Sequence, residues 1–506
     1  MRRELLFLIG VLASTAFSVD ERLPVESTAS FPHRCPSTDI PQRFLRILSN
    51  SVSPKTAIVF PGSNGYVNAL HHWSETAQVQ SAAIVQPANS KDLSNIIALA
   101  SSYNIDFAVA SGGHNNDGAS STKGLLIDLS RFNEVRVSSN KKEVTVGAGL
   151  RWGKVYDRIA PYNISLVGGR VSTVGVGGFT LGGGYGWKTG KYGLAADTII
   201  RAEMVLANGR IVTVSSTENP DLYFAIRGGG GQFGVVTKFV FRALPQKNPV
   251  FSGFYFYSKD QVQAVAKTME KWVATNKDEK ANLMLIFAKP PPSFDPVPVV
   301  LVWYDGPASI AKPAFKAFQD LKPTSDDTAE MSFAVSNTLQ DPLVTDGDRK
   351  TMASIAWKTI TREKILKAYD FYVDFTTKVP SAAQSSVLIE PVFSNAFKGI
   401  RYGESAYPHT KPLHVIGLVP RWLSSKEDAI VKRWVSKGTA LLRAQERPNI
   451  VYPNYSGYYE PLSNMFGANL ARLNSLKARY DRDCVFRHGF VFQTQRCRRC
   501  PAPASW

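Results

Sequence analysis

One histidine stands in a glycine-rich turn where it could touch a bound ligand. The chain has seven histidines, and the stretch SGGHNNDGAS places His114 directly after Gly112 and Gly113. Glycines let a backbone approach a ligand closely, so a ring nitrogen of His114 could contact a bound planar cofactor. A loop histidine alone is more often held by hydrogen bonds than chemically active, and the glycines are what favour the chemical role here.

Two further glycine clusters could bind phosphate groups. They are VGGRVSTVGVGGFTLGGGYG at 167–186 and RGGGGQFG at 227–234, and such loops let backbone N–H groups point at a pyrophosphate. The alternative is that these glycines serve only tight turns. The literal G-x-G-x-x-G at Gly229, Gly231 and Gly234 does not predict a Rossmann fold, because Gly234 opens a β-branched strand and not a helix.

Strands, with few helices, surround these glycines. Ser90 is predicted as the N-cap of a helix, and Asn208-Gly209 as the two-residue turn of a hairpin. Alternation and turn signals predict strands at 82–87, 105–111 and 234–241 and hairpins at 134–149 and 199–216.

The region 251–447 has a different character. Its strand-like segments, such as ANLMLIFAK and LHVIGLVPRW, come in runs, while the helical periodicity of 259–274 and 427–445 stands apart from them. Runs of strands with separate helices predict an α+β layer that covers the first domain.

The charge and the cysteines limit the class of protein. The formal charge is +18, but the basic residues are scattered, which favours a dispersed basic surface around an anionic cofactor or substrate over a nucleic-acid-binding stripe. Four cysteines suit an oxidising compartment, but they are too few for disulfides to be the main source of stability. The C-x-x-C pair in RCRRC at 496–500 is a poor zinc site, so we expect a disulfide or a loose tail there and no bound metal.

The N-terminus has the pattern of a secretory signal peptide. Residues 1–18 combine Arg2 and Arg3 with an apolar stretch and small residues before an expected cleavage after Ser18; the alternative is a buried N-terminal helix. No later stretch has the ~20 apolar residues of a membrane span. Asn163 and Asn454 begin glycosylation sequons.

Several motifs in order resemble one flavoprotein family. SGGHNNDGAS, VTVGAGLRWGKVY, STVGVGGFTLGGGYGWKTGKYGLAADTI and NPDLYFAIRGGGGQFGVVTKF resemble the FAD domain of the vanillyl-alcohol-oxidase (PCMH-type) superfamily. YPNY at 452–455 and FGANLARLNSLKARYDRDCVF at 466–486 resemble the C-terminal segment of its berberine-bridge-enzyme-like branch. The resemblance implies a two-part FAD-binding domain and an α+β substrate domain with an antiparallel sheet.

The resemblance also implies a role for individual residues. His114 would bond covalently to the ring methyl of the flavin, and Val174 lies where relatives govern oxygen access. Val236 would meet the adenine side, while Asn454 and Asn469 would close over the cofactor. The flavin would be cradled by Ser111, Gly112, Gly113 and Asn115, and its pyrophosphate would lie near Gly175, Gly177, Gly178, Gly182 and Gly183.

The sequence departs from the family pattern at two places. Val171 stands where many relatives have a second, cysteine-linked flavin bond, so we expect FAD bound covalently through His114 only, and a compact substrate rather than a large glycan. Arg482 and Cys484 stand where relatives often have D-P-x-x-V-F, and the segment 491–506 has no assignment.

The predicted reaction needs a proton acceptor. Hydride removal beside a hydroxyl or amine leaves a proton, and the resemblance favours Tyr455 as the base, provided that neighbours stabilise its phenolate. The alternative is that Tyr455 packs on the flavin and Glu390 is the base.

Together these features predict a secreted FAD-dependent oxidase that forms hydrogen peroxide from oxygen. Its partners would be a small organic substrate, such as a secondary metabolite, and oxygen, with no nucleic acid and no membrane, and the protein would be a monomer. A carbohydrate oxidase, a flavin dehydrogenase and a basic surface-binding module are the alternatives. The expected divisions are a FAD-binding domain at 19–250 with its core at 78–247, a substrate domain at 251–447 and a returning segment at 448–490.

Overall fold

The computed structural model describes residues 35–500 apart from 394–396, 398, 402, 410–412, 445, 447–449 and 458–459. The chain divides into Met1–Cys35 and Pro36–Trp506, and the account below concerns the second unit. The expected signal peptide at 1–18 lies outside the described residues. None of the helices in the described part of the chain is long and apolar enough to cross a membrane.

A four-stranded sheet carries the turn that contains His114. Its order is β1-β2-β4-β3, with β2, β4 and β3 parallel and β1 antiparallel to β2. Helix α3 (Ser90–Ser102) connects β2 to β3. Its N-cap is Asn89, whose side chain accepts a hydrogen bond from the Asp92 amide, so the predicted cap at Ser90 is wrong by one residue. The strands are β1 (Ala57–Val59), β2 (Ala83–Gln86), β3 (Phe107–Ala110) and β4 (Leu125–Asp128).

A five-stranded antiparallel sheet holds both predicted hairpins in the order β5-β6-β10-β8-β9. The second hairpin has a longer turn than predicted, because Val205 pairs with Ile211. A two-residue type I′ turn needs positive φ at both central residues, whereas of Asn208 and Gly209 only Gly209 has one, at +79°. The strands are β5 (Val135–Val137), β6 (Glu143–Gly147), β8 (Ile199–Val205), β9 (Ile211–Ser215) and β10 (Val235–Arg242).

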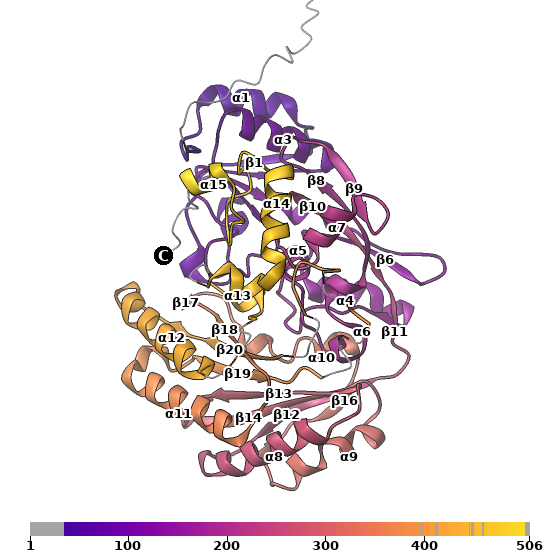
Figure 1. The fold of residues 1–506 in the computed structure, drawn as a ribbon, viewed down its shortest axis with the longest axis vertical. Coiled ribbons are helices and arrows are strands. Elements are labelled where there is room, and N and C mark those ends of the chain that lie inside the picture. The colour runs from indigo at the N-terminus through magenta and orange to yellow at the C-terminus, as the bar shows by residue number, and fades with distance from the viewer. Residues whose placement is uncertain are drawn as a thin grey trace, which may run out of the picture. The chain divides into compact units, whose positions relative to one another are not determined.

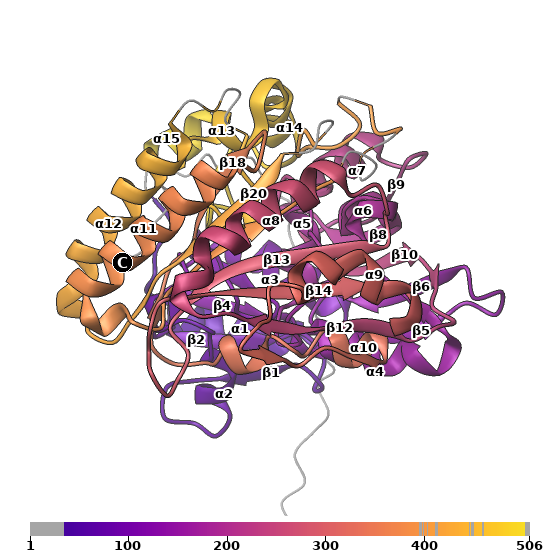
Figure 2. The same cartoon turned by 90° about the horizontal axis from the view of Figure 1, so that it is seen from below.

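An eight-stranded antiparallel sheet forms most of the region 251–447, in the order β15-β12-β14-β13-β19-β20-β18 with β16 beside β12. Leu283 and Leu285 belong to a core shared with helices α8, α9, α11 and α12, whereas Met284 and Ile286 alternate onto the opposite face. Figure 2 shows these helices together over the sheet. The predicted α+β class is confirmed. The strands are β12 (Val250–Phe256), β13 (Ala281–Ala288), β14 (Val297–Tyr304), β15 (Ser325–Asp326), β16 (Ala329–Met331), β18 (Ala353–Trp357), β19 (Ser386–Glu390) and β20 (His414–Val419), and the helices are α8 (Val262–Thr275), α9 (Ala308–Gln319), α11 (Arg362–Lys378) and α12 (Asp428–Arg443).

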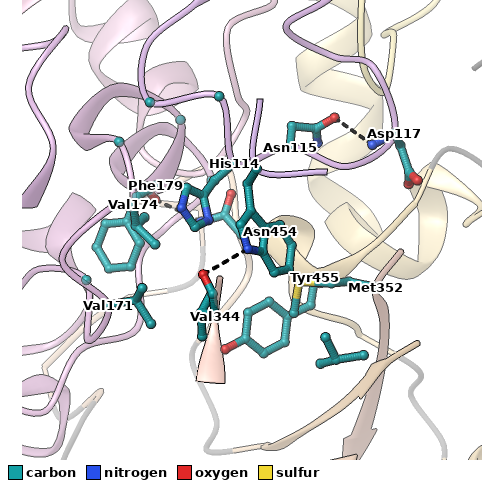
Figure 3. A pocket seen from close by; sticks show the side chains of 18 of the residues that line it. His114, Asn115, Asp117, Val171, Val174, Phe179, Val344, Met352, Asn454 and Tyr455 are labelled. Carbon is teal, nitrogen blue, oxygen red and sulfur yellow. Dashed lines mark hydrogen bonds between the residues drawn. The ribbon is translucent and has the colours of Figure 1, made fainter. Parts of the chain in front are cut away.

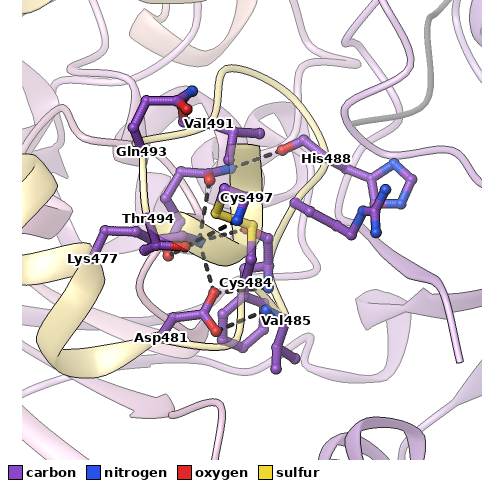
Figure 4. The surroundings of a disulfide bond; sticks show 12 residues. Lys477, Asp481, Cys484, Val485, His488, Val491, Gln493, Thr494 and Cys497 are labelled. Atoms are coloured by element: carbon purple, nitrogen blue, oxygen red, sulfur yellow. Dashed lines mark hydrogen bonds and ion pairs between the residues drawn. A yellow bond between two sulfur atoms is a disulfide. The ribbon is translucent and has the colours of Figure 1, made fainter. Parts of the chain in front are cut away.

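The C-terminal residues return to the first two sheets. Helix α14 (Leu470–Tyr480) packs on α7 (Pro220–Ile226), and Figure 1 shows the two helices near each other. A disulfide joins Cys484 to Cys497 (Figure 4), so the C-x-x-C pair does not form a disulfide of its own. The segment left unassigned by sequence is therefore folded at least as far as the short helix α15 (Gln495–Arg499).

Candidate active site

A cavity of about 880 Å³ lies between the glycine loops and the eight-stranded sheet. Figure 3 shows His114, Val174, Asn454 and Tyr455 around it. Glu390, Gly183 and Asn469 are the predicted site residues that do not line it. The cavity lining includes Ser111, Gly112, Gly113, His114, Asn115, Val174, Gly175, Gly177, Gly178, Gly182, Val236, Asn454 and Tyr455.

His114 is held between an aromatic ring and a hydroxyl. Its ring stacks on Trp73, with centroids 5.1 Å apart and planes 7° from parallel, and its Nε2 lies 2.8 Å from Thr173 Oγ1. Burial, followed by the positive charges of Arg151 and Lys350, lowers the pKa of His114 from its ordinary 6.5 to about 3. The imidazole is therefore neutral at physiological pH, with a ring-nitrogen lone pair available for bonding.

Close backbone contact fixes the turn before His114. A Cβ on Gly112 would lie 2.4 Å from Gly175 Cα, so these two glycines let the two loops touch. Ser111 Oγ donates to the Ala148 carbonyl at 2.6 Å and accepts from the Gly177 amide at 3.3 Å. These residues hold the loops together as well as lining the cavity.

Other glycines leave space instead. A Cβ on Gly178 or on Gly231 would meet no atom within 4 Å, so the backbone there faces open space and side chains are absent where a ligand could approach. Gly182 makes room for Asn454, since a Cβ on it would lie 1.9 Å from Asn454 Oδ1. Gly183, at φ +105°, packs against Leu194 behind the lining.

The three predicted asparagines have distinct positions. Asn115 Oδ1 accepts hydrogen bonds from the Asp117 and Ala119 amides and so shapes its own turn. Asn454 Nδ2 donates to the Phe179 carbonyl and to Tyr452 Oη, both at 2.9 Å. Asn469 lies away from the cavity, where its Nδ2 donates to the carbonyls of residues 405 and 406.

Tyr455, Glu390 and Arg170 form a polar cluster at the sheet side of the cavity. Tyr455 Oη donates to Glu390 Oε1 at 2.9 Å, and Arg170 Nη2 bonds to Glu390 Oε2 and lies 3.4 Å from Tyr455 Oη. Burial and the charge of Glu390 raise the pKa of Tyr455 well above its ordinary value, and Arg170 opposes this rise only in part. A cation is thus present beside the phenol, as the predicted base requires, but a carboxylate keeps the phenol protonated.

The rest of the sheet side is mostly apolar. The side chains that line it come from neighbouring strands. In β19 every second residue faces the same side of the sheet, so Ser386, Leu388 and Glu390 form a row that ends at the polar cluster. The apolar wall consists of Phe254, Phe256, Ile286, Val299 and Leu388.

Sequence reasoning missed Arg170, Trp73 and Thr173. Arg170 and Thr173 lie inside the 167–186 glycine cluster, and Trp73 follows two histidines in HHW. Nothing in their local pattern marks them, because each gains its role only from contact with a residue distant in sequence. Among the described residues, no group of three or more side chains is arranged to hold a metal ion.

Comparisons with known proteins identify the family of the chain. Residues 81–215 match the family model "FAD binding domain", and residues 451–489 match "Berberine and berberine like". A FAD-dependent monooxygenase of Arthrobotrys oligospora is 31% identical over 381 residues, which is 71% of this chain and 70% of that protein. The chain belongs to the berberine-bridge-enzyme-like family of FAD-linked oxidoreductases.

Other similar proteins cover more of the chain. A FAD-linked oxidoreductase of Aspergillus terreus, pgmH, is 29% identical over 458 residues, covering 84% of this chain and 90% of its own. The solved structure of Physcomitrella patens BBE-like 1 has a TM-score of 0.78 at 22% identity and covers 92% of this chain and 99% of that one. A xylooligosaccharide oxidase from Myceliophthora thermophila, in complex with xylobiose, has a TM-score of 0.77 at 22% identity, with coverage of 89% and 99%.

The cavity suits the FAD of this family. Open backbone at Gly178 and Gly231 leaves room for a cofactor at close range, and the neutral His114 can approach a flavin ring without desolvating a charge. These residues, together with Val236 and Asn454, would hold the cofactor.

Proposed function

We propose that the protein is an oxidase that removes a hydride from a compact, largely apolar organic substrate and forms hydrogen peroxide from oxygen. The observation that carries the proposal is the hydrogen bond from Tyr455 to Glu390 in the cavity that also contains His114. The bound flavin would accept the hydride and pass two electrons to oxygen.

Tyr455 and Glu390 act together on the proton. Oxidation of a C–H bond beside a hydroxyl releases one hydride and one proton, and only the Tyr455 hydroxyl of this pair lines the cavity. As Tyr455 takes the substrate proton, its own proton moves to Glu390 Oε1 over 2.9 Å. Arg170 binds the other carboxylate oxygen and keeps Glu390 in position. Tyr455 and Glu390 thus share the role that the sequence left open between them.

His114 holds the flavin by the single covalent bond. Its neutral imidazole would form this bond to the ring methyl of the flavin. With Nε2 as the donor to Thr173 Oγ1, Nδ1 would carry the lone pair that bonds. Val171 lines the same cavity and has no thiol for a second bond.

The apolar wall favours a compact apolar substrate over a carbohydrate. A sugar presents hydroxyl groups that need hydrogen-bond partners when they are buried, and Phe254, Phe256 and Ile286 offer none. Aromatic or polyketide-like alcohols fit such a wall better.

The chain is also proposed to be secreted, with a signal peptide at 1–18 and domains at 19–250, 251–447 and 448–490. The Cys484–Cys497 disulfide suits an oxidising compartment.

A substrate screen tests the proposed function. The purified protein is mixed without oxygen with aromatic alcohols and with xylooligosaccharides, and loss of the yellow flavin colour is followed; oxygen is then admitted and peroxide is measured. We expect bleaching by aromatic alcohols and about one peroxide per reduced flavin. Bleaching by oligosaccharides alone, or reoxidation without peroxide, would contradict the proposal.

A further inference from the structure

The sheet side of the cavity extends well beyond the reacting groups. Ser386, Leu388 and Glu390 face the same side of β19, and the first two line the cavity. Four residues of strand span about 13 Å, at roughly 3.3 Å per residue. A substrate that reacts at Tyr455 therefore has a wall beside it as long as a biphenyl with a substituent at each end.

A cation lies at the end of this wall that is remote from Tyr455. A Cβ on Gly417 would lie 3.3 Å from Tyr455 Cδ2, so Gly417 faces the cavity from β20. Val419 and Arg421 follow along the chain and also line the cavity. Val419 pairs with Ser386 across the sheet, and Arg421 is 7% exposed. Arg421 and Ser386 thus belong to the same end of the cavity.

The Arg421 guanidinium is held rigidly but not saturated. Its Nε donates to Asp348 Oδ2 at 3.0 Å, its Nη1 to the Leu343 carbonyl at 2.9 Å and its Nη2 to Thr345 Oγ1 at 2.9 Å. Nη2 also lies 2.9 Å from Asp348 Oδ2. A guanidinium has five N–H donors, so one N–H of Nη1 has no acceptor among the described residues. A buried donor without an acceptor costs free energy, and a ligand oxygen would remove that cost.

The charge around Arg421 is positive. Asp348 pairs with both Arg421 and Lys350, and Lys350 is fully buried. Within the part of the chain that the structure describes, neither cation forms an ion pair with a second carboxylate. The nearby Asp346 is exposed and pairs with His71 at 3.4 Å. Two buried cations therefore share one carboxylate, which favours an anionic ligand at this end of the cavity.

Ser386 adds a hydroxyl at the same end. Its Oγ forms no hydrogen bond with any described residue, and it is half-buried on the cavity face of β19. Between Ser386 and Tyr455 the wall presents apolar side chains such as Ile286 and Leu388. Hydrogen-bonding groups thus stand at both ends of an apolar wall.

We propose that Arg421 and Ser386 bind a carboxylate at the end of the substrate remote from the oxidised carbon. The substrate is then an elongated aromatic alcohol that carries an acidic group. The planar donors of a guanidinium match the two oxygens of a carboxylate. This inference rests on the proposed function, because it takes Tyr455 as the reacting end. The alternative is that Arg421 serves only to hold the loop from Leu343 to Asp348.

Binding of two unreactive probes tests the carboxylate site. Biphenyl carboxylic acid, substituted at the para position, and its methyl ester have no hydroxyl to oxidise, and each is titrated into the wild-type holoenzyme while flavin absorbance is followed. We expect the acid to bind at least tenfold more tightly than the ester. Arg421→Met should abolish this preference and change the ester affinity less than twofold. Equal affinities in the wild-type protein, or equal loss of both ligands in Arg421→Met, would overturn the proposal.

Lys289→Met is the matched control for net charge. Lys289 also lines the cavity, but its Nζ donates to the Thr376 carbonyl of α11 at 3.4 Å. Its removal should leave the preference for the acid unchanged. If Lys289→Met and Arg421→Met reduce the preference equally, the acid responds to overall charge and the proposed site is wrong.

Ser386→Ala keeps the proposal testable if Arg421→Met does not fold. This variant leaves every contact of Arg421 in place. We expect the acid to bind at least threefold more weakly and the ester to bind as in the wild-type protein. Unchanged acid affinity would overturn the site as proposed.

A reactive probe separates this inference from the proposed function. The same biphenyl acid with a hydroxymethyl group at the opposite para position is mixed anaerobically with the holoenzyme. In Arg421→Met, the concentration for half-maximal flavin reduction should rise at least tenfold, and the limiting rate should change less than threefold, because Arg421 is remote from Tyr455. Tight binding of the acids without loss of yellow colour would contradict the oxidase reaction and support the carboxylate site. Bleaching that does not depend on the acidic group would overturn the carboxylate site and support the oxidase reaction.

Discussion

Two uncharged groups on the cavity wall have pKa values that burial and nearby charges shift in opposite directions. His114 lies near Arg151 and Lys350, which with burial lower the pKa of its imidazole to about 3. Tyr455 bonds to Glu390, which with burial raises the pKa of its phenol well above its ordinary value. Burial aided by cations thus leaves His114 with a lone pair, whereas burial aided by an anion leaves Tyr455 with its proton. The same physical effects would prepare His114 to form the proposed bond and Tyr455 to relay the proposed proton.

Removing either member of the relay has the largest expected effect. Glu390→Gln and Tyr455→Phe should each slow flavin reduction by substrate about 10²–10³-fold, within the usual range for a general base, while the protein stays yellow. The double variant should be no slower than the slower single variant, because the two groups act as one unit. Anaerobic stopped-flow absorbance measures all three rates.

Two variants serve as controls for this prediction. Tyr372 is buried in the helix-covered core, and its hydroxyl has no hydrogen-bond partner among the described residues, so Tyr372→Phe should leave reduction unchanged. Glu330 is exposed, and Glu330→Gln should also be neutral. A normal rate of flavin reduction in both Glu390→Gln and Tyr455→Phe would contradict the proposed proton relay.

The cations around His114 predict an unusual pH dependence of flavin attachment. The neutral imidazole is the reactive form and is present above its pKa, so covalent incorporation into flavin-free protein should stay constant from pH 8 to pH 5 and decline only near pH 3–4. An imidazole with the ordinary pKa of 6.5 would lose about thirtyfold in rate at pH 5. In-gel flavin fluorescence measures the incorporated fraction.

Arg151→Met sharpens this test. Because the positive charge of Arg151 lowers the pKa of His114, its removal should move the decline to higher pH. Incorporation that already falls between pH 7 and pH 5 in the wild-type protein would show that His114 is not held neutral.

A smaller effect is expected at the residue beside His114. Val174 lines the cavity, and Val174→Leu adds a methylene where we expect oxygen to approach. The rate of flavin reoxidation by air should fall severalfold, whereas the rate of flavin reduction by substrate should fall less. Equal slowing of the two half-reactions in stopped-flow experiments would speak against control of oxygen access.

The two sequons should differ in whether they carry a glycan, and we expect no effect on the reaction rate. Asn454 Nδ2 is already used in two internal hydrogen bonds, whereas Asn163 is exposed, with φ +56°. Peptide mapping of protein secreted from a glycosylating host should find a glycan on Asn163 and none on Asn454. A glycan on Asn454 would show that its side chain does not reach the position described here.

Local signals predicted which glycine loops line the cavity. The SGGH turn and the 167–186 cluster are visible because a glycine is needed wherever two backbones touch, as at Gly112 and Gly175. The errors there are small and also local: Asn89 replaces Ser90 as cap, since either side chain can accept the amide hydrogen bond. The α+β class followed from the runs of strands in 251–447.

Long-range contacts account for what the sequence did not predict. Arg170, Glu390 and Tyr455 meet only because the first glycine cluster, β19 and the C-terminal segment converge, and no local pattern encodes that convergence. Helix α11 was not predicted either. Residues 491–506 were left unassigned because C-x-x-C spacing does not specify that Cys497 pairs with a cysteine 13 residues away.

The most direct test of the central claim is to locate the flavin on the wild-type chain. The protein is precipitated with acid, digested and analysed by mass spectrometry beside His114→Ala. We predict that the yellow colour stays in the precipitate, that one flavin peptide containing His114 is found, and that His114→Ala releases its flavin entirely. Colour wholly in the supernatant of the wild-type protein, or flavin attached to a cysteine, would contradict the account.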